Sequence, residues 1–201
     1  DAKKTEYQLL TGNQIATLLV DYLVEADSHK HLTKKPLVVK SLVTTDLIAR
    51  IVESQGGRCK DVLTGFKYIA EQIADLEGPK GEAEYFLFGC EESYGFLTLP
   101  QVRDKDAVSS ALASVELMCY WATQGLTLEQ RLAQIYAKWG YSTEAVFSKD
   151  YEGASGKEKM AAIMANLRKL SPGDELAGST IEGIQDLLDG KQTAFPPSDV
   201  L

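Results

Sequence analysis

Short apolar runs alternate with longer stretches of helical periodicity along the first two thirds of the chain. Residues 36–43, 59–63 and 85–88 have the length and the branched or aromatic composition of buried strands. Helical spacing of apolar residues follows the first two runs, at residues 47–52 and 68–73. Such alternation is typical of a parallel sheet that helices cover on both faces. We therefore predict α/β class, with a three-layer α/β/α domain and a mostly parallel sheet.

Further elements are predicted on either side of these strands. Residues 6–10 fit a short strand, and residues 11–14 and 127–130 both have the T-x-x-Q form of a capping box at a helix start. The longest helical pattern starts near Lys105 and carries an apolar stripe that we predict to face the core. That stripe consists of Val108, Ala111, Leu112, Val115, Met118 and Ala122.

The periodic pattern weakens after Gly140. The remaining signals are a strand-like run at residues 141–147, a helix capped by residues 155–158, and short segments at residues 179–181 and 184–188. We predict two domains. Residues 1–140 form the complete α/β domain, and residues 141–201 form a partial α+β segment, the incomplete start of a second domain.

The composition limits the classes of partner. A net charge of −8 over 201 residues argues against general attraction to nucleic acid or to an anionic membrane. No apolar run approaches the roughly 20 residues of a membrane span. Cys59, Cys90 and Cys119 form no C-x-x-C pair, which is typical of a reducing compartment and predicts a cytoplasmic protein. His29 and His31 have no Cys or acidic partner at ligand spacing, so we predict a solvated loop and no metal ligands there.

Polar loops follow all three predicted strands, at residues 44–45, 64–67 and 89–95. Because ligands of parallel α/β sheets bind outside the carboxyl ends of the strands, we expect these loops to share one site. In the third loop, Glu91 and Ser93 suit the recognition of hydroxyl groups. A carboxylate accepts hydrogen bonds from two vicinal hydroxyls, and a serine donates or accepts. The alternative is a solvent-exposed turn with surface acids.

Other interpretations of the charged residues stay open. Glu91 and Glu92 could form a general acid–base pair, although adjacent side chains usually point apart. Asp104 and Asp106 could hold Mg²⁺, but a helix start explains them equally well. Residues 153–157 lack the G-x-x-x-x-G-K-[ST] pattern of a phosphate loop, so we interpret them as a capped helix start.

Arg103 and Lys105 lie just before the longest predicted helix, whose first N–H groups carry partial positive charge. We expect Lys105 to lie close to Glu91 and Ser93, within reach of a sugar oxygen or a phosphate. A solvated basic pair beside aspartates is the alternative.

Five short motifs together resemble the third domain of the α-D-phosphohexomutases, and the phosphoglucomutase branch in particular. They are LTGNQ at 10–14, VTT at 43–45, TGFKYI at 64–69, FGCEESYG at 88–95 and RDKD at 103–106. The resemblance is strong over residues 1–140 and loose over residues 141–201, which resemble part of the fourth domain of that family without its phosphate loop. Cys90 departs from the family pattern. S-Y-G at 93–95 differs from the S-G-H of the branch that uses both mannose and glucose phosphates, which favours glucose.

The resemblance implies an intramolecular phosphotransferase, an isomerase that interconverts glucose 1-phosphate and glucose 6-phosphate or related hexose phosphates. It implies a phosphoserine in the first domain, a bisphosphate intermediate, and Mg²⁺ that aspartates of the second domain hold, so that its ligands lie outside this chain. The implied site residues are Lys105 as the catalytic residue, and Glu91, Ser93, Thr64, Gly65 and Arg103 as substrate-binding residues.

Three further motifs of that family are absent from the sequence: a serine loop like T-A-S-H-N-P, a metal loop like D-G-D-x-D-R and a phosphate loop like R-x-S-G-T-E-P. We therefore expect a fragment that is inactive alone, whose partners are a hexose phosphate and the remaining domains of the same polypeptide. Alternatives are a phosphopentomutase of the same family, and a stand-alone α/β sugar-binding or regulatory module without catalysis. A Rossmann-type nucleotide binder is disfavoured because G-x-G-x-x-G follows none of the predicted strands.

Overall fold

The computed structural model describes residues 8–27, 33–145, 148–186 and 191–193. The chain separates into two compact units, residues 1–144 and residues 145–201. The division that the sequence predicts, residues 1–140 and 141–201, remains a prediction about domains that fold independently. None of the helices in the described part of the chain combines the length and the apolar character that crossing a bilayer requires.

The first unit is built on a mixed, mostly parallel sheet with the strand order β2-β1-β3-β4. Its strands are β1 (Lys35–Ser41), β2 (Arg58–Val62), β3 (Glu84–Glu91) and β4 (Gly95–Leu97). Strand β1 pairs in parallel with β2 on one side and with β3 on the other, while β4 folds back antiparallel on the end of β3. The predicted α/β class with a mostly parallel sheet is confirmed.

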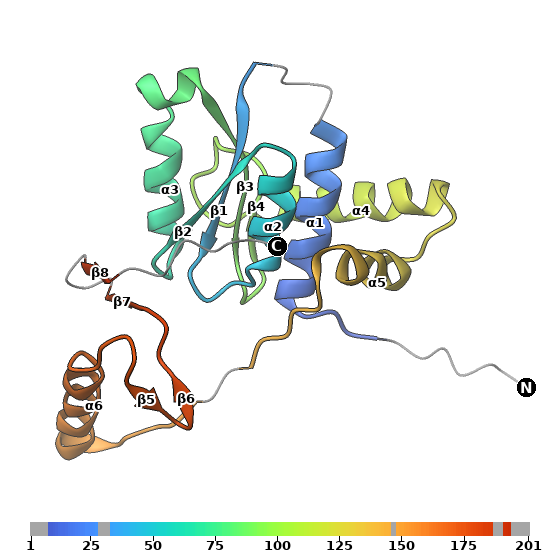
Figure 1. Ribbon diagram of the computed structural model, residues 1–201. Helices are drawn as coiled ribbons and strands as arrows, with labels where there is room; N and C mark the ends of the chain where they lie inside the picture. Colours follow the sequence, from blue (N-terminus) through green and yellow to red (C-terminus); the bar gives the residue numbers. More distant parts are fainter. Residues whose placement is uncertain (1–7, 28–32, 146–147, 187–190, 194–201) are drawn as a thin grey trace, which may run out of the picture. The chain divides into compact units, whose positions relative to one another are not determined.

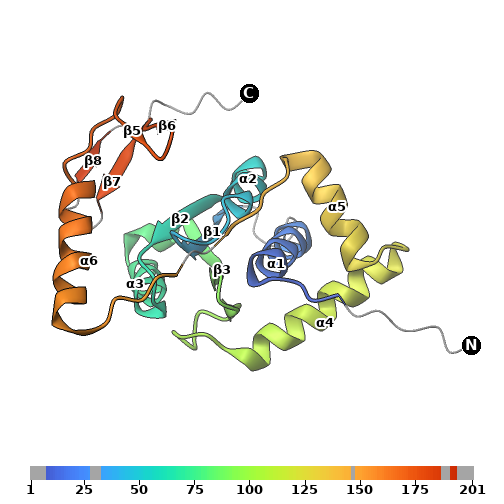
Figure 2. The same cartoon turned by 90° about the horizontal axis from the view of Figure 1, so that it is seen from below.

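Helices cover both faces of this sheet (Figures 1 and 2). Helices α1 and α2 contact one face, α3 contacts the other, and α4 and α5 pack on the outside of α1. Because β1 is central, its side chains enter two separate cores: Val38 packs with α1 and α2, whereas Leu37 and Val39 pack with α3. The helices are α1 (Gly12–Asp27), α2 (Leu47–Ser54), α3 (Phe66–Asp75), the 3₁₀ turn η1 (Pro79–Glu82), α4 (Ala107–Thr123) and α5 (Leu128–Trp139).

Side-chain caps fix several helix starts. At α1, the Thr11 N–H donates to Gln14 Oε1 (2.9 Å) and the Gln14 N–H donates to Thr11 Oγ1 (3.2 Å), so the predicted capping box is confirmed. The same reciprocal pair is present at the start of α5, between Thr127 and Gln130. Asp106 caps α4 by accepting from two backbone N–H groups of its first turn. The start of helix α4 is therefore fixed by a side-chain cap.

The exposed face of α4 contradicts the sequence prediction. Val108 and Leu112, from the stripe predicted to be buried, are 81% and 61% exposed, while Leu117 and Trp121 are 2% exposed. Because α4 is apolar on nearly all sides, more than one stripe fits the helical spacing. The contacts with α1 and α5 select the stripe that carries Trp121, whose ring also lies against the Arg131 guanidinium at 4.0 Å.

The structure also differs from the sequence prediction at one predicted loop and at one predicted strand. Strand β3 continues to Glu91 and β4 begins at Gly95, so residues 89–95 form a tight hairpin and not an open loop. Of the predicted strand at residues 6–10, residues 6 and 7 lie outside the described residues, and residues 8–10 are not in a strand.

In its described residues, the second unit contains one helix and two small antiparallel strand pairs. Of the strand predicted at residues 141–147, residues 141–145 form no strand, and residues 146–147 lie outside the described residues. The helix of the second unit begins at residue 153, two positions before residue 155, where the predicted cap starts. The elements are α6 (Gly153–Leu167), β5 (Glu175–Leu176), β6 (Ser179–Thr180), β7 (Ile184–Asp186) and β8 (Lys191–Thr193).

Truncation of the two leucines on opposite faces of α4 tests which face is buried. Leu117→Ala is expected to lower the free energy of unfolding by about 3 kcal/mol, because it removes buried methyl groups and leaves a cavity. Leu112→Ala serves as the matched control and is expected to change it by less than about 0.5 kcal/mol. Urea unfolding followed by circular dichroism measures both. Equal losses would contradict the assignment of the faces.

Candidate functional site

The carboxyl ends of β1, β2 and β3 lie at one edge of the sheet, because the three strands are parallel. We call the residues that follow or end these strands, 41–46, 62–66 and 91–95, the rim. Side chains connect the three parts of the rim directly. Ser41 Oγ donates to Glu92 Oε2 (3.1 Å), and the Gly65 N–H donates to Glu91 Oε1 (2.6 Å). The predicted meeting of the three loops is therefore present in the structure.

Glu91 is held between two other parts of the chain. It is the last residue of β3, and its side chain is 11% exposed. One oxygen, Oε1, accepts the Gly65 N–H, which Gly65 presents with φ = 117°, a backbone angle that disfavours residues with a side chain. The other oxygen, Oε2, lies 3.5 Å from Lys105 Nζ. The carboxylate oxygen that Gly65 does not bind, Oε2, therefore lies on the side of Lys105.

Lys105 lies over an aromatic ring beside this carboxylate. Its Nζ is 4.6 Å from the centroid of the Phe66 ring, and its side chain is more than half exposed. A separation of 3.5 Å is long for a charge-assisted hydrogen bond, whose usual length is about 2.7–2.9 Å. A hydroxyl group beside the pair could accept from the ammonium and donate to Glu91 Oε2. This pair is therefore suited to binding a hydroxyl-bearing ligand.

The turn between β3 and β4 carries the other polar groups. It lies against the start of α1, where a Cβ on Gly12 would come within 1.9 Å of the Glu92 carbonyl oxygen, so only glycine allows this approach. Ser93, at the tip, is exposed and has no hydrogen-bond partner in the described part of the chain, and the same holds for Thr64 across the rim. Both hydroxyls are therefore available to a ligand. Glu92 faces Ser41 and not the Glu91–Lys105 pair.

Arg103 is the predicted site residue that the structure does not bring to this pair. It has φ = 61°, and its guanidinium forms an ion pair with Glu77. It lines a hollow of about 340 Å³ together with Ile73, Phe86 and other residues on the α3 side of the sheet. To contact a ligand at Glu91, the guanidinium would have to leave Glu77.

The two cysteines of the sheet are not poised as nucleophiles. Burial raises the pKa of Cys59 to about 12, although the nearby Lys40 ammonium acts in the opposite direction. Cys90 is fully buried, and burial raises the pKa of its thiol as well. Both therefore stay protonated at neutral pH, when thiols are weak nucleophiles.

Carboxylates beside the rim have structural partners. The described residues contain no group of three or more His, Cys, Asp or Glu side chains close enough to share a metal ion. Asp106 caps α4, and Asp104 accepts the backbone N–H of Lys105 (2.7 Å), so each carboxylate has a structural role. His29 and His31 lie outside the described residues. The described carboxylates beside the rim therefore do not fit a Mg²⁺ site.

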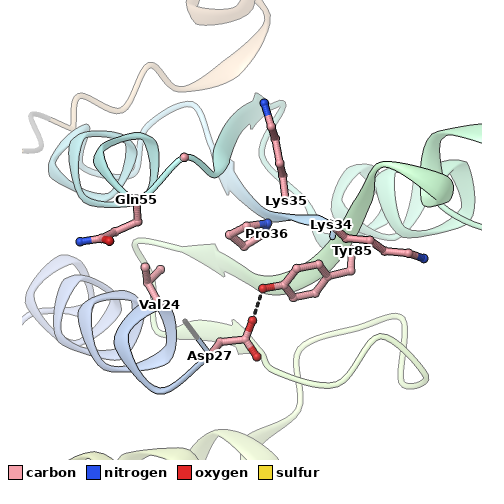
Figure 3. A pocket seen from close by; sticks show the side chains of 8 residues that line it. Val24, Asp27, Lys34, Lys35, Pro36, Gln55 and Tyr85 are labelled. Carbon is pink, nitrogen blue, oxygen red and sulfur yellow. Dashed lines mark hydrogen bonds between the residues drawn. The ribbon is translucent and has the colours of Figure 1, made fainter. Parts of the chain in front are cut away.

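A separate hollow of about 270 Å³ lies at the opposite end of the sheet, where β1 and β3 begin (Figure 3). Tyr85 donates a hydrogen bond to Asp27 across it, and the Lys34 and Lys35 side chains point away from each other. Its polar groups therefore do not converge on one position. The rim carries the Glu91 carboxylate next to Lys105 and the exposed hydroxyls of Ser93 and Thr64, so it is the better candidate for recognition of a polar ligand.

Sequence reasoning missed three residues that shape the rim. Phe66 supports Lys105, Ser41 binds Glu92, and Lys40 lies beneath the loops with its side chain 1% exposed. A lysine inside the apolar run at residues 36–43 was a detectable signal, because an ammonium in a central strand needs buried partners. Nothing in the sequence distinguishes Phe66 from an ordinary core residue.

Comparisons with known proteins identify the family of the chain. A family model described as phosphoglucomutase/phosphomannomutase, alpha/beta/alpha domain III, matches residues 11–139. The phosphoglucomutase of Staphylococcus aureus strain N315 is 36% identical over 177 residues, which cover 88% of this chain and 31% of the relative. The chain thus spans about a third of the length of such curated relatives.

Two solved structures share the fold. A putative phosphomannomutase from Thermus thermophilus aligns with a TM-score of 0.50 and 24% identity, over 65% of this chain and 26% of that one. The Paramecium phosphoprotein pp63/parafusin, a phosphoglucomutase, aligns with a TM-score of 0.57 and 16% identity, over 92% of this chain and 31% of that one.

The layers, the strand order and the polar rim thus define the class as an α/β/α domain of the phosphohexomutase type. The chain belongs to the phosphoglucomutase/phosphomannomutase family, and residues 11–139 correspond to domain III of that family. The resemblance drawn from the five motifs is confirmed.

Substitution of Gly95 tests how tightly the Glu91 carboxylate is held. A Cβ at Gly95 would lie 2.9 Å from the Phe66 ring and 3.3 Å from Glu91 Oε2. Gly95→Ala is expected to lower the free energy of unfolding by about 1–3 kcal/mol through overpacking, and to shift the ¹H–¹⁵N signal of Gly65. In the control Gly78→Ala, the added Cβ would lie 3.7 Å from the nearest atom, so the change stays within about 1 kcal/mol. An unmoved Gly65 signal in Gly95→Ala would contradict the packing described.

Proposed function

We propose that this chain binds the sugar ring of a hexose phosphate at the rim. The observation that carries the proposal is the Glu91–Lys105 pair, in which the Gly65 N–H fixes one carboxylate oxygen and the second oxygen lies 3.5 Å from the ammonium. A sugar hydroxyl at that position would have one donor and one acceptor. Ser93 and Thr64 are exposed on the same rim and would bind neighbouring hydroxyls.

Within this proposal, Lys105 is the catalytic residue, because its ammonium would contact the reacting hydroxyl. Glu91, Ser93, Thr64 and the Gly65 backbone form the binding surface. Arg103 stays a weaker part of the proposal, since its guanidinium is engaged by Glu77. A role for Arg103 in binding a sugar or a phosphate depends on release of that ion pair.

We further propose that a longer protein containing this domain interconverts glucose 1-phosphate and glucose 6-phosphate. Support comes from membership of the family and from the curated relatives, which carry the name phosphoglucomutase. Phosphoryl transfer requires in-line placement and neutralisation of charge. The phosphoserine, the Mg²⁺ and the clamp for the second phosphate would come from other domains of such a protein, and the present domain would supply the orientation of the ring.

The proposed location is the cytoplasm. Cys59, Cys90 and Cys119 are free thiols in the structure, as is usual for proteins of reducing compartments. Hexose phosphates are the proposed ligands, and we propose neither nucleic acid nor a membrane surface as a partner because the net charge is −8.

Titration of the 201-residue chain with glucose 1-phosphate, followed by ¹H–¹⁵N NMR, tests the binding surface. Signals of Gly65, Ser93 and Lys105 are expected to shift. Glu91→Gln replaces an acceptor by a donor that faces the Lys105 ammonium, so it is expected to weaken binding about tenfold. The adjacent Glu92→Gln is the matched control and is expected to change the Kd less than about twofold, because the amide oxygen of glutamine can still accept the hydrogen bond from Ser41. Equal effects of the two variants, or no binding by the unmodified chain, would overturn the proposal.

The chain alone is expected to show no mutase activity, because the sequence contains no serine loop or metal loop of the family. The measurement is a coupled assay of glucose 6-phosphate formation from glucose 1-phosphate, with Mg²⁺ and glucose 1,6-bisphosphate present. The Staphylococcus aureus phosphoglucomutase serves as the positive control. Turnover by the purified chain above the rate without protein would show that these residues hold a phosphoryl-transfer centre.

A further inference from the structure

Lys40 is a charged residue in the centre of the sheet. Its side chain is 1% exposed, although it lies in the middle strand β1. The ammonium has three donors, and each has an acceptor: Asp61 Oδ1 at 2.8 Å, Asp46 Oδ1 at 3.0 Å and the Thr44 carbonyl oxygen at 3.0 Å. The charge is therefore satisfied by one group of the neighbouring strand β2 and by two groups of the connection between β1 and α2.

Lys40 stays protonated although its side chain is buried. Burial lowers the pKa of Lys40, but hydrogen bonds and charges from Asp61 and Asp46 outweigh that effect and hold it above the ordinary value. Replacement of a buried ion pair by apolar residues is often neutral or stabilising. A contribution to overall stability therefore does not explain why an ammonium occupies this core position. The arrangement of its acceptors gives a better explanation.

Two of the three acceptors lie in one part of the rim, and the third lies in the strand that leads into a second part. Asp61 is in β2, at the position paired with Lys40 and four residues before Gly65. Thr44 and Asp46 belong to the connection between β1 and α2. Asp46 occupies the N-cap position of α2 without capping it, and its carboxylate faces Lys40 instead. The ammonium therefore bridges the β1–α2 connection and the end of β2.

The third part of the rim is joined to this arrangement through hydroxyls and backbone. Thr44 Oγ1 lies 2.7 Å from Ser41 Oγ, which donates to Glu92. On the other side, the end of β2 leads to Gly65, whose N–H donates to Glu91. Both routes from Lys40 end at the β3–β4 hairpin, which carries Glu91.

We propose that Lys40 is a positioning residue for hexose-phosphate binding: its buried ammonium sets the distance between the rim connections and thereby the place of Glu91 relative to Lys105. This inference rests on the proposed function for its ligand. Lys40 does not touch the ligand. Its effect passes through Asp61 and Gly65 on one route and through Thr44 and Ser41 on the other.

Lys40→Met tests the inference, because methionine keeps most of the side-chain length without the charge. In the folded variant, the ¹H–¹⁵N signals of both Thr45 and Gly65 are expected to move, and the Kd for glucose 1-phosphate is expected to rise at least fivefold. Val52→Ala is the matched control, since it also perturbs a fully buried position but lies in α2 away from the rim. It is expected to reduce stability while leaving both signals and the Kd unchanged within twofold.

Two surface variants separate the two routes and do not depend on the folding of Lys40→Met. Asp61 and Asp46 are 51% and 76% exposed, so each can be changed to asparagine without burying a new group. Asp61→Asn is expected to move the Gly65 signal much more than the Thr45 signal. Asp46→Asn is expected to do the reverse.

The outcomes are distinct for the two proposals. If the unmodified chain does not bind glucose 1-phosphate, the proposed function fails, while the Thr45 and Gly65 signals still decide the role of Lys40. If those signals stay in place in Lys40→Met, or in both asparagine variants, Lys40 does not position the rim. An equal loss of affinity in Val52→Ala would also overturn the inference, because it would reflect reduced stability alone.

Discussion

The parallel pairing of β1 with both of its neighbours is the constraint on which the remaining structure depends. In this register Lys40 stands beside Asp61 on one side and Cys90 on the other, so the three strands end at nearly the same level. Consequently the chain leaves the sheet three times at one edge, and short side chains are enough to join the connections. An antiparallel arrangement of the same strands would place Gly65 and Glu91 at opposite ends.

The elements whose local signals agree with their tertiary contacts could be predicted from the sequence. The strand cores, the alternation with helices and the capping boxes at Thr11 and Thr127 were of this kind. The buried face of α4 was not, because Val108 and Leu117 belong to different stripes that are both apolar. Only the position of α1 and α5 decides between them, and no local pattern contains that information.

The candidate site was predictable to a similar extent. The meeting of Glu91, Gly65 and Lys105 follows from the parallel topology, once the strand ends are known. The direction of Arg103 does not, because its left-handed backbone angle turns the side chain toward Glu77. A glycine near the end of β3 has a packing role. A Cβ at Gly89 would meet the Ile69 side chain at 2.7 Å, so this glycine serves the packing of α3 and not the approach of a ligand.

The polar groups of the rim divide into those that the fold already uses and those that it leaves free. Glu91 Oε1 and the Gly65 N–H bind each other, and Glu92 is bound by Ser41. The remaining capacity lies in Glu91 Oε2, the Lys105 ammonium and the exposed hydroxyls of Ser93 and Thr64. A rigid set of internal hydrogen bonds therefore presents a smaller set of open ones, so ligand binding would not require the loss of any backbone-fixing contact. Recognition of hydroxyls on this rim thus depends on the same contacts that join the three strand ends.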